Sequence, residues 1–250
     1  MTGPSFDERR LSFGEQAARY DAYRPEYAPR AVDWVLEGAS RPVHDVADIG
    51  AGTGKLTRAL AARGLSVTAV EPDPEMLAAL LAGAPGVRGE NAPAEHLPLG
   101  DASVDALFVG QAWHWFDAGP TAREFRRVLR PGGVVGILWN DRDDAAAPWL
   151  GELRTLLEDH FVAEYTSDES ARSLEEVFPG VEADLFANTL VLGPDAVIGL
   201  VSTYSYVRLR DDADEVIRLA RVLLPDPVEV DGRLVIEIPH RTATYRWTRP

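Results

Sequence analysis

Seven consecutive residues, Asp48-Ile49-Gly50-Ala51-Gly52-Thr53-Gly54, could bring backbone N–H groups and a helix N-terminus against a small ligand. Glycine has no Cβ, so a turn with glycine at every second position lets the main chain approach a ligand closely. Glu71 stands at the end of the next apolar run, and its carboxylate has two oxygens that can accept hydrogen bonds from a diol. The turn and the acid together indicate a site for a ligand that contains a ribose.

Two nucleotide-binding interpretations fit this turn poorly. In a P-loop, Lys55 would be followed by Ser or Thr, but Leu56 stands there, and Ile49 replaces the first required glycine. In a dinucleotide-binding turn, a third glycine lets the helix pack on the strand, and Lys55 would crowd that contact. Glu71 does not separate the candidates, because each of these cofactors has a ribose diol.

S-adenosylmethionine (SAM) suits the turn better, since it carries an amino acid, a sulfonium, a ribose and an adenine but no pyrophosphate. Asp48 can lie near the ammonium, directly or through water, while Gly50, Gly52 and Gly54 admit the amino acid and the sulfonium. Glu71 can accept both ribose hydroxyls. A plain structural turn is the other interpretation, because glycine turns are common.

Strand and helix patterns alternate around the turn. The predicted strands span 43–49, 66–70, 87–90, 104–109, 134–139, 182–192 and 234–247, and the predicted helices span 11–23, 29–37, 55–63, 73–81, 121–129, 147–161, 170–178, 195–205 and 213–223, with a loop over 225–231. This order predicts an α/β fold with a doubly wound, mostly parallel, seven-stranded Rossmann-like sheet. We expect a single domain over 1–250, with an N-terminal helical lid (1–40), a SAM-binding core (41–140), and a segment that completes the sheet and partly covers the acceptor side (141–250).

Four motifs in this order resemble those of the class I SAM-dependent methyltransferases. Asp48 to Gly54 is similar to their first motif, and Ala69-Val70-Glu71-Pro72-Asp73 to their ribose-binding motif. Ala94-Glu95-His96-Leu97-Pro98 with Asp101 to Ala106 resembles their adenine-side loop and fourth strand, and Arg130-Pro131-Gly132-Gly133 the turn before the fifth. The resemblance implies SAM as cofactor, bound by Asp48, Gly50, Gly52, Gly54, Glu71, Pro72, Ala94, Glu95 and Gln111. In one departure, Glu90-Asn91-Ala92-Pro93 replaces the continuous acidic loop of the relatives. The sequence therefore fixes the position of the adenine contacts only to within several residues.

A closer resemblance is to a small-molecule subgroup that includes trans-aconitate-type enzymes. It rests on Phe13-Gly14 through Tyr20, on Tyr23-Arg24-Pro25, on Gln111 to Asp117, and on Trp139-Asn140-Asp141. This resemblance implies that Tyr20 and Arg24 close on the SAM carboxylate, for which the arginine fork is suited. A surface arginine beside a core tyrosine is the other interpretation.

The acceptor is expected near Gln111, Trp113 and His114, because ligands of open α/β sheets bind at the carboxyl ends of the strands. Transfer of the activated methyl group is an in-line displacement that needs alignment above all, and a base only if the acceptor holds a proton. His114 is the candidate base, since histidine titrates near neutral pH, although a structural histidine would look the same. Trp113, Trp139 and Tyr204 are expected to line the acceptor pocket, with core packing as the alternative.

Charge and composition limit the partners. The net charge of −15 disfavours DNA or RNA as acceptor, and Gln111-Ala112-Trp113-His114 stands where a nucleic-acid methyltransferase would carry Asn/Asp-Pro-Pro-aromatic. There is no cysteine, and the histidines lack the spacing of metal ligands, so no metal is expected. The polar start and the absence of an apolar run of about 20 residues predict a cytoplasmic protein with no membrane segment.

The expected function is methyl transfer from SAM to a small-molecule acceptor, with oxygen as the expected acceptor atom. The alternative is a SAM-binding protein of the same fold that does not methylate and instead catalyses a rearrangement or acts as a regulator.

Overall fold

The computed structural model describes residues 23–158, 173–204, 207 and 210–250. The predicted helix over 11–23, Tyr20 included, lies outside these residues except at its last position. The strands are β1 (Asp45–Ile49), β2 (Ser66–Val70), β3 (Arg88–Glu90), β4 (Val104–Gly110), β5 (Leu129–Arg142), β6 (Glu182–Leu192), β7 (Val228–Val230) and β8 (Arg233–Thr248). The helices are α3 (Pro29–Glu37), α4 (Lys55–Ala61), α5 (Pro74–Gly83), the 3₁₀ helix η2 (Trp113–Trp115), α6 (Ala118–Val128), α7 (Pro148–Glu158), α9 (Pro194–Ser202) and α11 (Ala213–Leu223).

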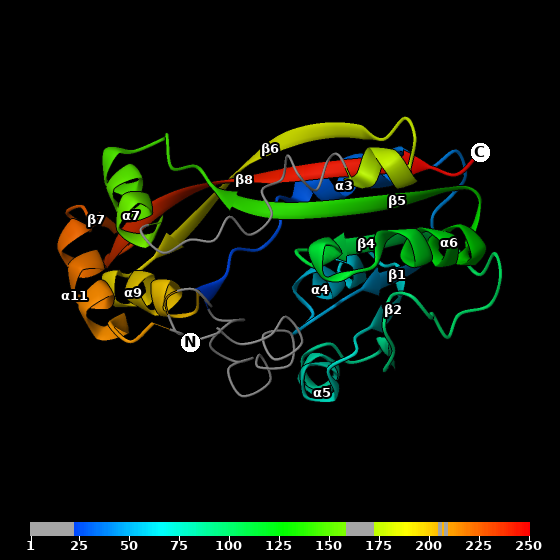
Figure 1. The fold of residues 1–250 in the computed structure, drawn as a ribbon, viewed down its shortest axis with the longest axis horizontal. Helices are drawn as coiled ribbons and strands as arrows, with labels where there is room; N and C mark the ends of the chain where they lie inside the picture. Colours follow the sequence, from blue (N-terminus) through cyan, green and yellow to red (C-terminus); the bar gives the residue numbers. More distant parts are fainter. Residues whose placement is uncertain (1–22, 159–172, 205–206, 208–209) are drawn as a thin grey trace.

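The strands form one twisted sheet in the order β3-β2-β1-β4-β5-β8-β6 (Figure 1). The first five strands of this order are parallel, and β8 runs antiparallel between β5 and β6. The predicted α/β class and the mostly parallel, doubly wound sheet are therefore confirmed. Strand order reverses next to β1, so the carboxyl ends of β1 and β4 lie at the switch point where such sheets bind ligands.

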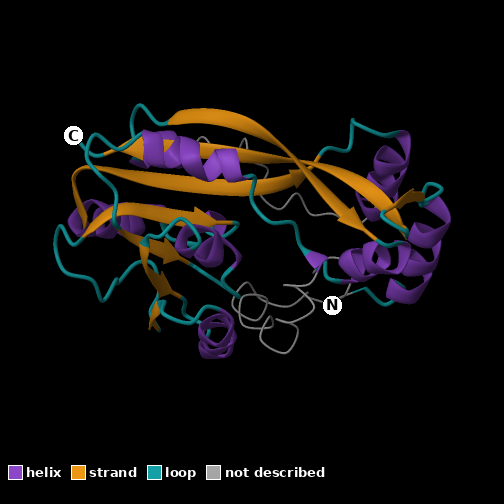
Figure 2. Ribbon diagram, turned by 180° about the vertical axis from the view of Figure 1, so that it is seen from behind, coloured by secondary structure: helices purple, strands orange, loops and turns teal. Residues whose placement is uncertain are grey.

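Helices cover both faces of the sheet, as Figure 2 shows from behind. Successive residues of β4 point to opposite faces: Ala106 and Phe108 pack with α3 and α4, whereas Leu107 and Val109 pack with α6. Residues 106–109 are all apolar because a central parallel strand is buried on both faces. The central strands are thus held rigidly from two directions.

The largest differences from the expected strands are at β5 and β7. β5 was predicted over 134–139 but begins at Leu129 and ends at Arg142, and its pairing with β4 is irregular between Val104 and Ala106. The Pro-Gly-Gly sequence therefore lies within a long strand at a bulge, where Gly132 has a φ of +77°. The loop predicted over 225–231 contains the short strand β7, which pairs with β8 and adds an eighth strand to the seven.

A second apolar cluster lies at the far end of β6 and β8. Helices α7, α9 and α11 gather there, on the side of the molecule away from α5 and α6 (Figure 1). Leu150, Leu153, Val201 and Val216 pack in this cluster with Ile236 from the start of β8. The region after residue 141 thus both completes the sheet and builds a helical layer at one end of it.

Asp105 joins the amino ends of β1 and β4, at the edge of the sheet opposite the glycine turn. Its carboxylate accepts hydrogen bonds from the His44 and Asp45 N–H groups, both at 3.0 Å, and from Arg130 at 2.9 Å. Burial acts to raise the pKa of Asp105, but these donors outweigh burial and hold the pKa below its usual value. Its side chain is only 4% exposed, so solvent screens these contacts weakly.

Asp105→Ala should lower the free energy of unfolding by about 3 kcal/mol, because removing one partner strands the others in a buried site. Urea denaturation would measure the loss. Asp101→Ala is the matched control: its ion pair with Arg127 has an 81% exposed carboxylate and should contribute less than about 1 kcal/mol. Equal losses in the two variants would contradict the anchoring role of Asp105.

Candidate active site

The glycine turn connects β1 to α4 and has the left-handed backbone that glycine tolerates. The φ angles are +67° at Gly50, +55° at Gly52 and +89° at Gly54. A Cβ on Gly50 would lie 2.7 Å from the Ala112 Cβ, and one on Gly54 would lie 2.7 Å from Leu80 Cγ. Among the described residues, a Cβ on Gly52 would meet nothing within 4 Å. Gly50 and Gly54 are therefore required for packing, whereas Gly52 borders open space.

Glu71 lies directly after β2 and supports this turn. Its Oε2 accepts the Gly52 N–H at 2.8 Å, and its Oε1 accepts the Asp73 N–H at 2.9 Å. Asp73 in turn caps α5 by accepting from the N–H groups of Glu75 and Met76. Glu71 therefore ties the glycine turn to the start of α5.

Asp48 lies beneath the turn, fully buried in β1. Its Oδ2 accepts a hydrogen bond from the Thr57 hydroxyl of α4 at 2.6 Å. Its Oδ1 is also buried and has no hydrogen-bond partner among the described residues. Burial, and next the Glu71 carboxylate, raise the pKa of Asp48 to about 7 despite the opposing effect of Thr57. This buried acid is the least satisfied polar group close to the turn.

The loop after β3 was expected to hold Ala94 and Glu95 on the adenine side. Ala94 is 3% exposed and packs in the core, and the Glu95 carboxylate accepts the Asp117 N–H at the start of α6. Pro72 is half-buried beside Glu71. The side-chain amide of Asn91 donates to the carbonyls of Glu71 and Pro72, at 2.8 and 3.0 Å. The sequence patterns did not assign Asn91 to the site. The departure from the acidic loop at Glu90-Asn91-Ala92-Pro93 was the feature that could have indicated it.

Gln111 follows β4 with a left-handed backbone, at a φ of +58°. A non-glycine residue in this region costs on the order of 1 kcal/mol or more and persists only where neighbours hold it. The Gln111 N–H donates to the Leu138 carbonyl at 2.9 Å, and its side-chain amide donates to the Asn140 carbonyl at 3.0 Å. Such strain is typical of functional sites, and here it turns the chain at the carboxyl edge of the sheet.

Asn140 of β5 is the centre of a polar cluster that sequence spacing could not reveal. Its side-chain nitrogen donates to the carbonyls of Pro25 and Glu26, at 3.2 and 3.1 Å. Its Oδ1 accepts from the Thr242 hydroxyl at 2.6 Å and from Asn188 at 3.3 Å. The cluster therefore attaches the chain segment before α3 to three strands of the sheet.

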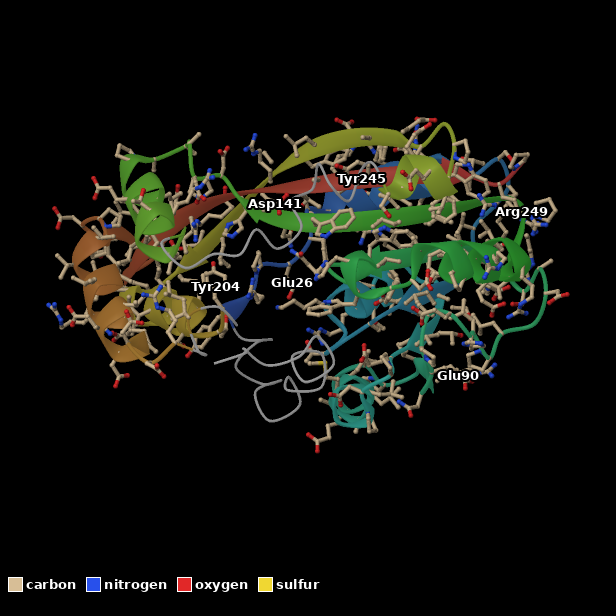
Figure 3. All side chains as sticks on the ribbon, in the orientation of Figure 1. Glu26, Glu90, Asp141, Tyr204, Tyr245 and Arg249 are labelled. Atoms are coloured by element: carbon tan, nitrogen blue, oxygen red, sulfur yellow. The ribbon has the colours of Figure 1, made fainter. Side chains whose placement is uncertain are left out.

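This segment, residues 24–28, spans from the cofactor side to the helical end of the molecule. Glu26 pairs with Lys55, the residue after the glycine turn, at 3.0 Å. The Arg24 guanidinium lies over the Tyr204 ring, 4.6 Å from its centroid. Figure 3 shows Glu26 between Tyr204 and the central part of the sheet. The structure thus brings together Arg24 and Tyr204, which the sequence placed in separate subsites.

His114 lies in η2 with its ring 4.8 Å from the Trp115 ring. Burial lowers the pKa of His114 to about 4, so the imidazole is neutral at pH 7 and is a weak base. The sequence had suggested this histidine because the residue type titrates near neutrality, and burial removes that reason.

Two predicted wall residues lie in the core instead. Trp113 is 3% exposed and packs against the rings of Phe116, Phe125 and Phe178 at centroid distances of 5.9 to 6.2 Å. Trp139 is also 3% exposed and meets Tyr245 edge to face at 5.5 Å. Large aromatic side chains gain more from burial than from partial exposure, which favours the core interpretation.

Among the described residues, no group of three or more His, Cys, Asp or Glu side chains could hold a metal ion. Within the same ranges, no helix has the length and apolar character that a membrane span requires.

The ring resonances of His114 should stay constant between about pH 5.5 and 8, because its pKa of about 4 keeps the ring unprotonated throughout that range. Heteronuclear NMR would record this titration, and the spectrum of His114→Gln would identify the resonance. A midpoint above about pH 6 would show that the ring is not desolvated as described.

Comparison with known proteins agrees with this geometry. Residues 47–137 match the family model for the methyltransferase domain. An uncharacterized methyltransferase of Mycobacterium tuberculosis is 43% identical over 196 residues, which cover 78% of this chain and 77% of that protein. A malonyl-[acyl-carrier protein] O-methyltransferase of Pectobacterium atrosepticum is 35% identical over 128 residues, covering 50% of this chain and 49% of that one.

Among solved structures, one described as a type II methyltransferase from Anaeromyxobacter dehalogenans has a TM-score of 0.72 and 28% identity, covering 90% of this chain and 98% of that chain. Because the family model, the relative and the solved structure are all methyltransferases, the chain belongs to the class I SAM-dependent methyltransferases.

Proposed function

We propose that this chain binds SAM over Gly52 and transfers its methyl group to an oxygen of a small-molecule acceptor. The observation that carries the placement is the open space at Gly52, bordered by a turn whose other two glycines are closed by packing. The residues fit the cofactor: the Glu71 carboxylate lies against the Gly52 N–H, where its oxygens suit a ribose diol, and Asp48 provides a buried carboxyl beneath the turn.

The remaining cofactor contacts follow from the same placement. Pro72 and the loop with Ala94, Glu95 and Asn91 adjoin Glu71, which suits the adenine side. Gln111 borders the opposite end of the site, where β4 ends. Tyr20 and Arg24 are proposed for the SAM carboxylate, Tyr20 from outside the described residues. Gly50 and Gly54 contribute by shaping the turn.

When bound, SAM supplies a methyl group already activated by the sulfonium. The chain then has to align the acceptor with that methyl and exclude water. The segment 24–28 serves this purpose, because it is fixed at once to the glycine turn through Lys55 and to the sheet through Asn140. Residues on both sides of the site are held in one arrangement as a result.

The residues expected around the acceptor favour an acceptor whose oxygen is already ionised. His114, with a pKa of about 4, is too weak a base to take a proton from a phenol or an alcohol efficiently. The pKa of buried His240 is lowered first by burial and then by Arg142 and Arg24, and the Arg142 guanidinium pairs with Asp144. A carboxylate acceptor needs no base, because it is already ionised at pH 7.

Within this proposal, His114 orients the acceptor as a neutral hydrogen-bonding ring, and Tyr204, whose ring lies under the Arg24 guanidinium, lines the acceptor pocket. The Pectobacterium relative is named as an O-methyltransferase, which supports oxygen as the acceptor atom. The likeness of residues 111–117 and 139–141 to the trans-aconitate-type subgroup supports a small-molecule acceptor. The net charge of −15 argues against nucleic acid.

Gly52→Val should weaken SAM binding by roughly tenfold to a hundredfold, because the added methyl groups occupy the space assigned to the ligand. Titration calorimetry with SAM and S-adenosylhomocysteine, with NAD as a negative control, would measure the change. Gly64→Val is the matched control: Gly64 has a φ of +76°, and no atom of the described part of the chain lies within 4 Å of a Cβ there, so backbone strain is similar without the proposed ligand nearby. Wild-type affinity in Gly52→Val, or an equal loss in Gly64→Val, would contradict the placement.

The acceptor class can be tested with SAM that carries a deuterated methyl group. The enzyme is incubated with matched sets of small carboxylic acids, phenols and amines, and mass spectrometry detects the labelled product. We expect methyl esters from the carboxylic acids. Labelled phenol ethers or amines in the absence of any ester would overturn the acceptor proposal and leave the family assignment intact.

A further inference from the structure

The buried pair of Asp48 and Thr57 lies beneath the glycine turn. Both side chains are fully buried, and the Thr57 hydroxyl donates to Asp48 Oδ2 at 2.6 Å. The other carboxylate oxygen has no hydrogen-bond partner within the described residues. An ionised carboxyl in this position is poorly compensated, because a buried charge requires several donors or an opposite charge.

The charged surroundings of Asp48 increase this imbalance. Glu71, directly after β2, is the charged neighbour that acts on Asp48, and it disfavours the ionised form. The Glu71 oxygens themselves accept two backbone N–H groups, which favour a negative charge on Glu71 rather than on Asp48.

The other elements packed around Asp48 do not offset that charge. On α4, Lys55 pairs with Glu26, and Arg58 donates to the Thr53 carbonyl. Within the sheet, Asp48 lies between Ala69 of β2 and Phe108 of β4, neither of which is charged.

We propose that Asp48 carries a proton in the ligand-free enzyme and releases it to solvent when the cationic cofactor binds, with Thr57 as the positioning residue that sets the pH of this exchange. The O–H bond of the acid breaks, the proton passes to buffer, and the carboxylate remains to balance the ammonium and sulfonium charges. The proposal rests on the cofactor site at Gly52. In this proposal SAM affinity depends on pH through Asp48. This dependence can be measured without an acceptor.

The direction of the effect follows from the two protonation states. An opposite charge within a few ångströms lowers the pKa of a carboxyl by about 1–3 units, so Asp48 is ionised in the bound state. Below about pH 7 the ligand-free protein must lose a proton before the charges can pair, so the affinity falls as the pH falls. Above about pH 8 the acid is already ionised, and the affinity becomes constant.

Titration calorimetry with SAM alone tests the proposal. At pH 7, experiments in phosphate and in Tris, whose ionisation enthalpies differ, should show release of roughly half a proton per bound SAM. The dissociation constant should increase about tenfold from pH 8 to pH 6. Asp48→Asn should bind SAM without proton release, with an affinity independent of pH and close to that of the wild type at low pH.

Thr57 variants separate positioning from structure. Thr57→Val removes a donor that favours the carboxylate, so the midpoint of the pH dependence should move to higher pH. Thr57→Ser retains the hydroxyl and should restore the wild-type midpoint. A purely structural role would lower thermal stability in Thr57→Val without moving this midpoint, and that result would overturn the role given to Thr57.

Binding of SAM with no proton release and equal affinity at pH 6 and 8 would refute the proton exchange while leaving the proposed function intact. A wild-type pH dependence in Asp48→Asn would equally refute it, because another group would then be responsible. Absence of SAM binding at every pH would instead refute the proposed cofactor site. If Asp48→Asn does not fold, the two Thr57 variants still decide the question.

Discussion

The hydrogen bond from the Gly52 N–H to the Glu71 carboxylate joins the two strands on which the candidate site is built. It can form only because Gly52 has a left-handed backbone, which bends the turn after β1 toward the end of β2. The same residue has no side chain, so the bond is made without closing the space beside it. The same carboxylate also accepts the Asp73 N–H and so ties the turn to the start of α5. The hydrogen bond between Gly52 and Glu71 thus both stabilises the fold and shapes the candidate binding site.

The second half of the site depends on contacts between distant parts of the chain. Asn140 attaches residues 25 and 26 to β5, and Asn188 on β6 donates to the same Glu26 carbonyl at 2.7 Å. Through the Asn140 carbonyl the cluster also holds Gln111 in its strained backbone. Because Glu26 pairs with Lys55 beside the glycine turn, a displacement on the acceptor side would be transmitted to the cofactor side. Rigid positioning of this kind suits a reaction in which alignment supplies most of the rate.

Local patterns predicted much of this molecule. The strand over Ser66–Val70, the strand over Glu182–Leu192 and the helix over Ala213–Leu223 form as expected, since periodicity and turn residues are local properties. Trp113 and Trp139 were assigned to the pocket wall but are buried, because their exposure is decided by rings from other elements. His114 was chosen for its residue type, and burial alone changed its basicity. The Asn140 cluster joins residues more than a hundred positions apart, which no spacing rule can detect.

A crystal structure of the protein with S-adenosylhomocysteine would test the central claim most directly. The account predicts ligand density in the space beside Gly52, with the ribose hydroxyls on the Glu71 carboxylate and the amino acid portion near the buried Asp48. Density elsewhere on the sheet edge, with the space at Gly52 filled by protein side chains, would contradict it.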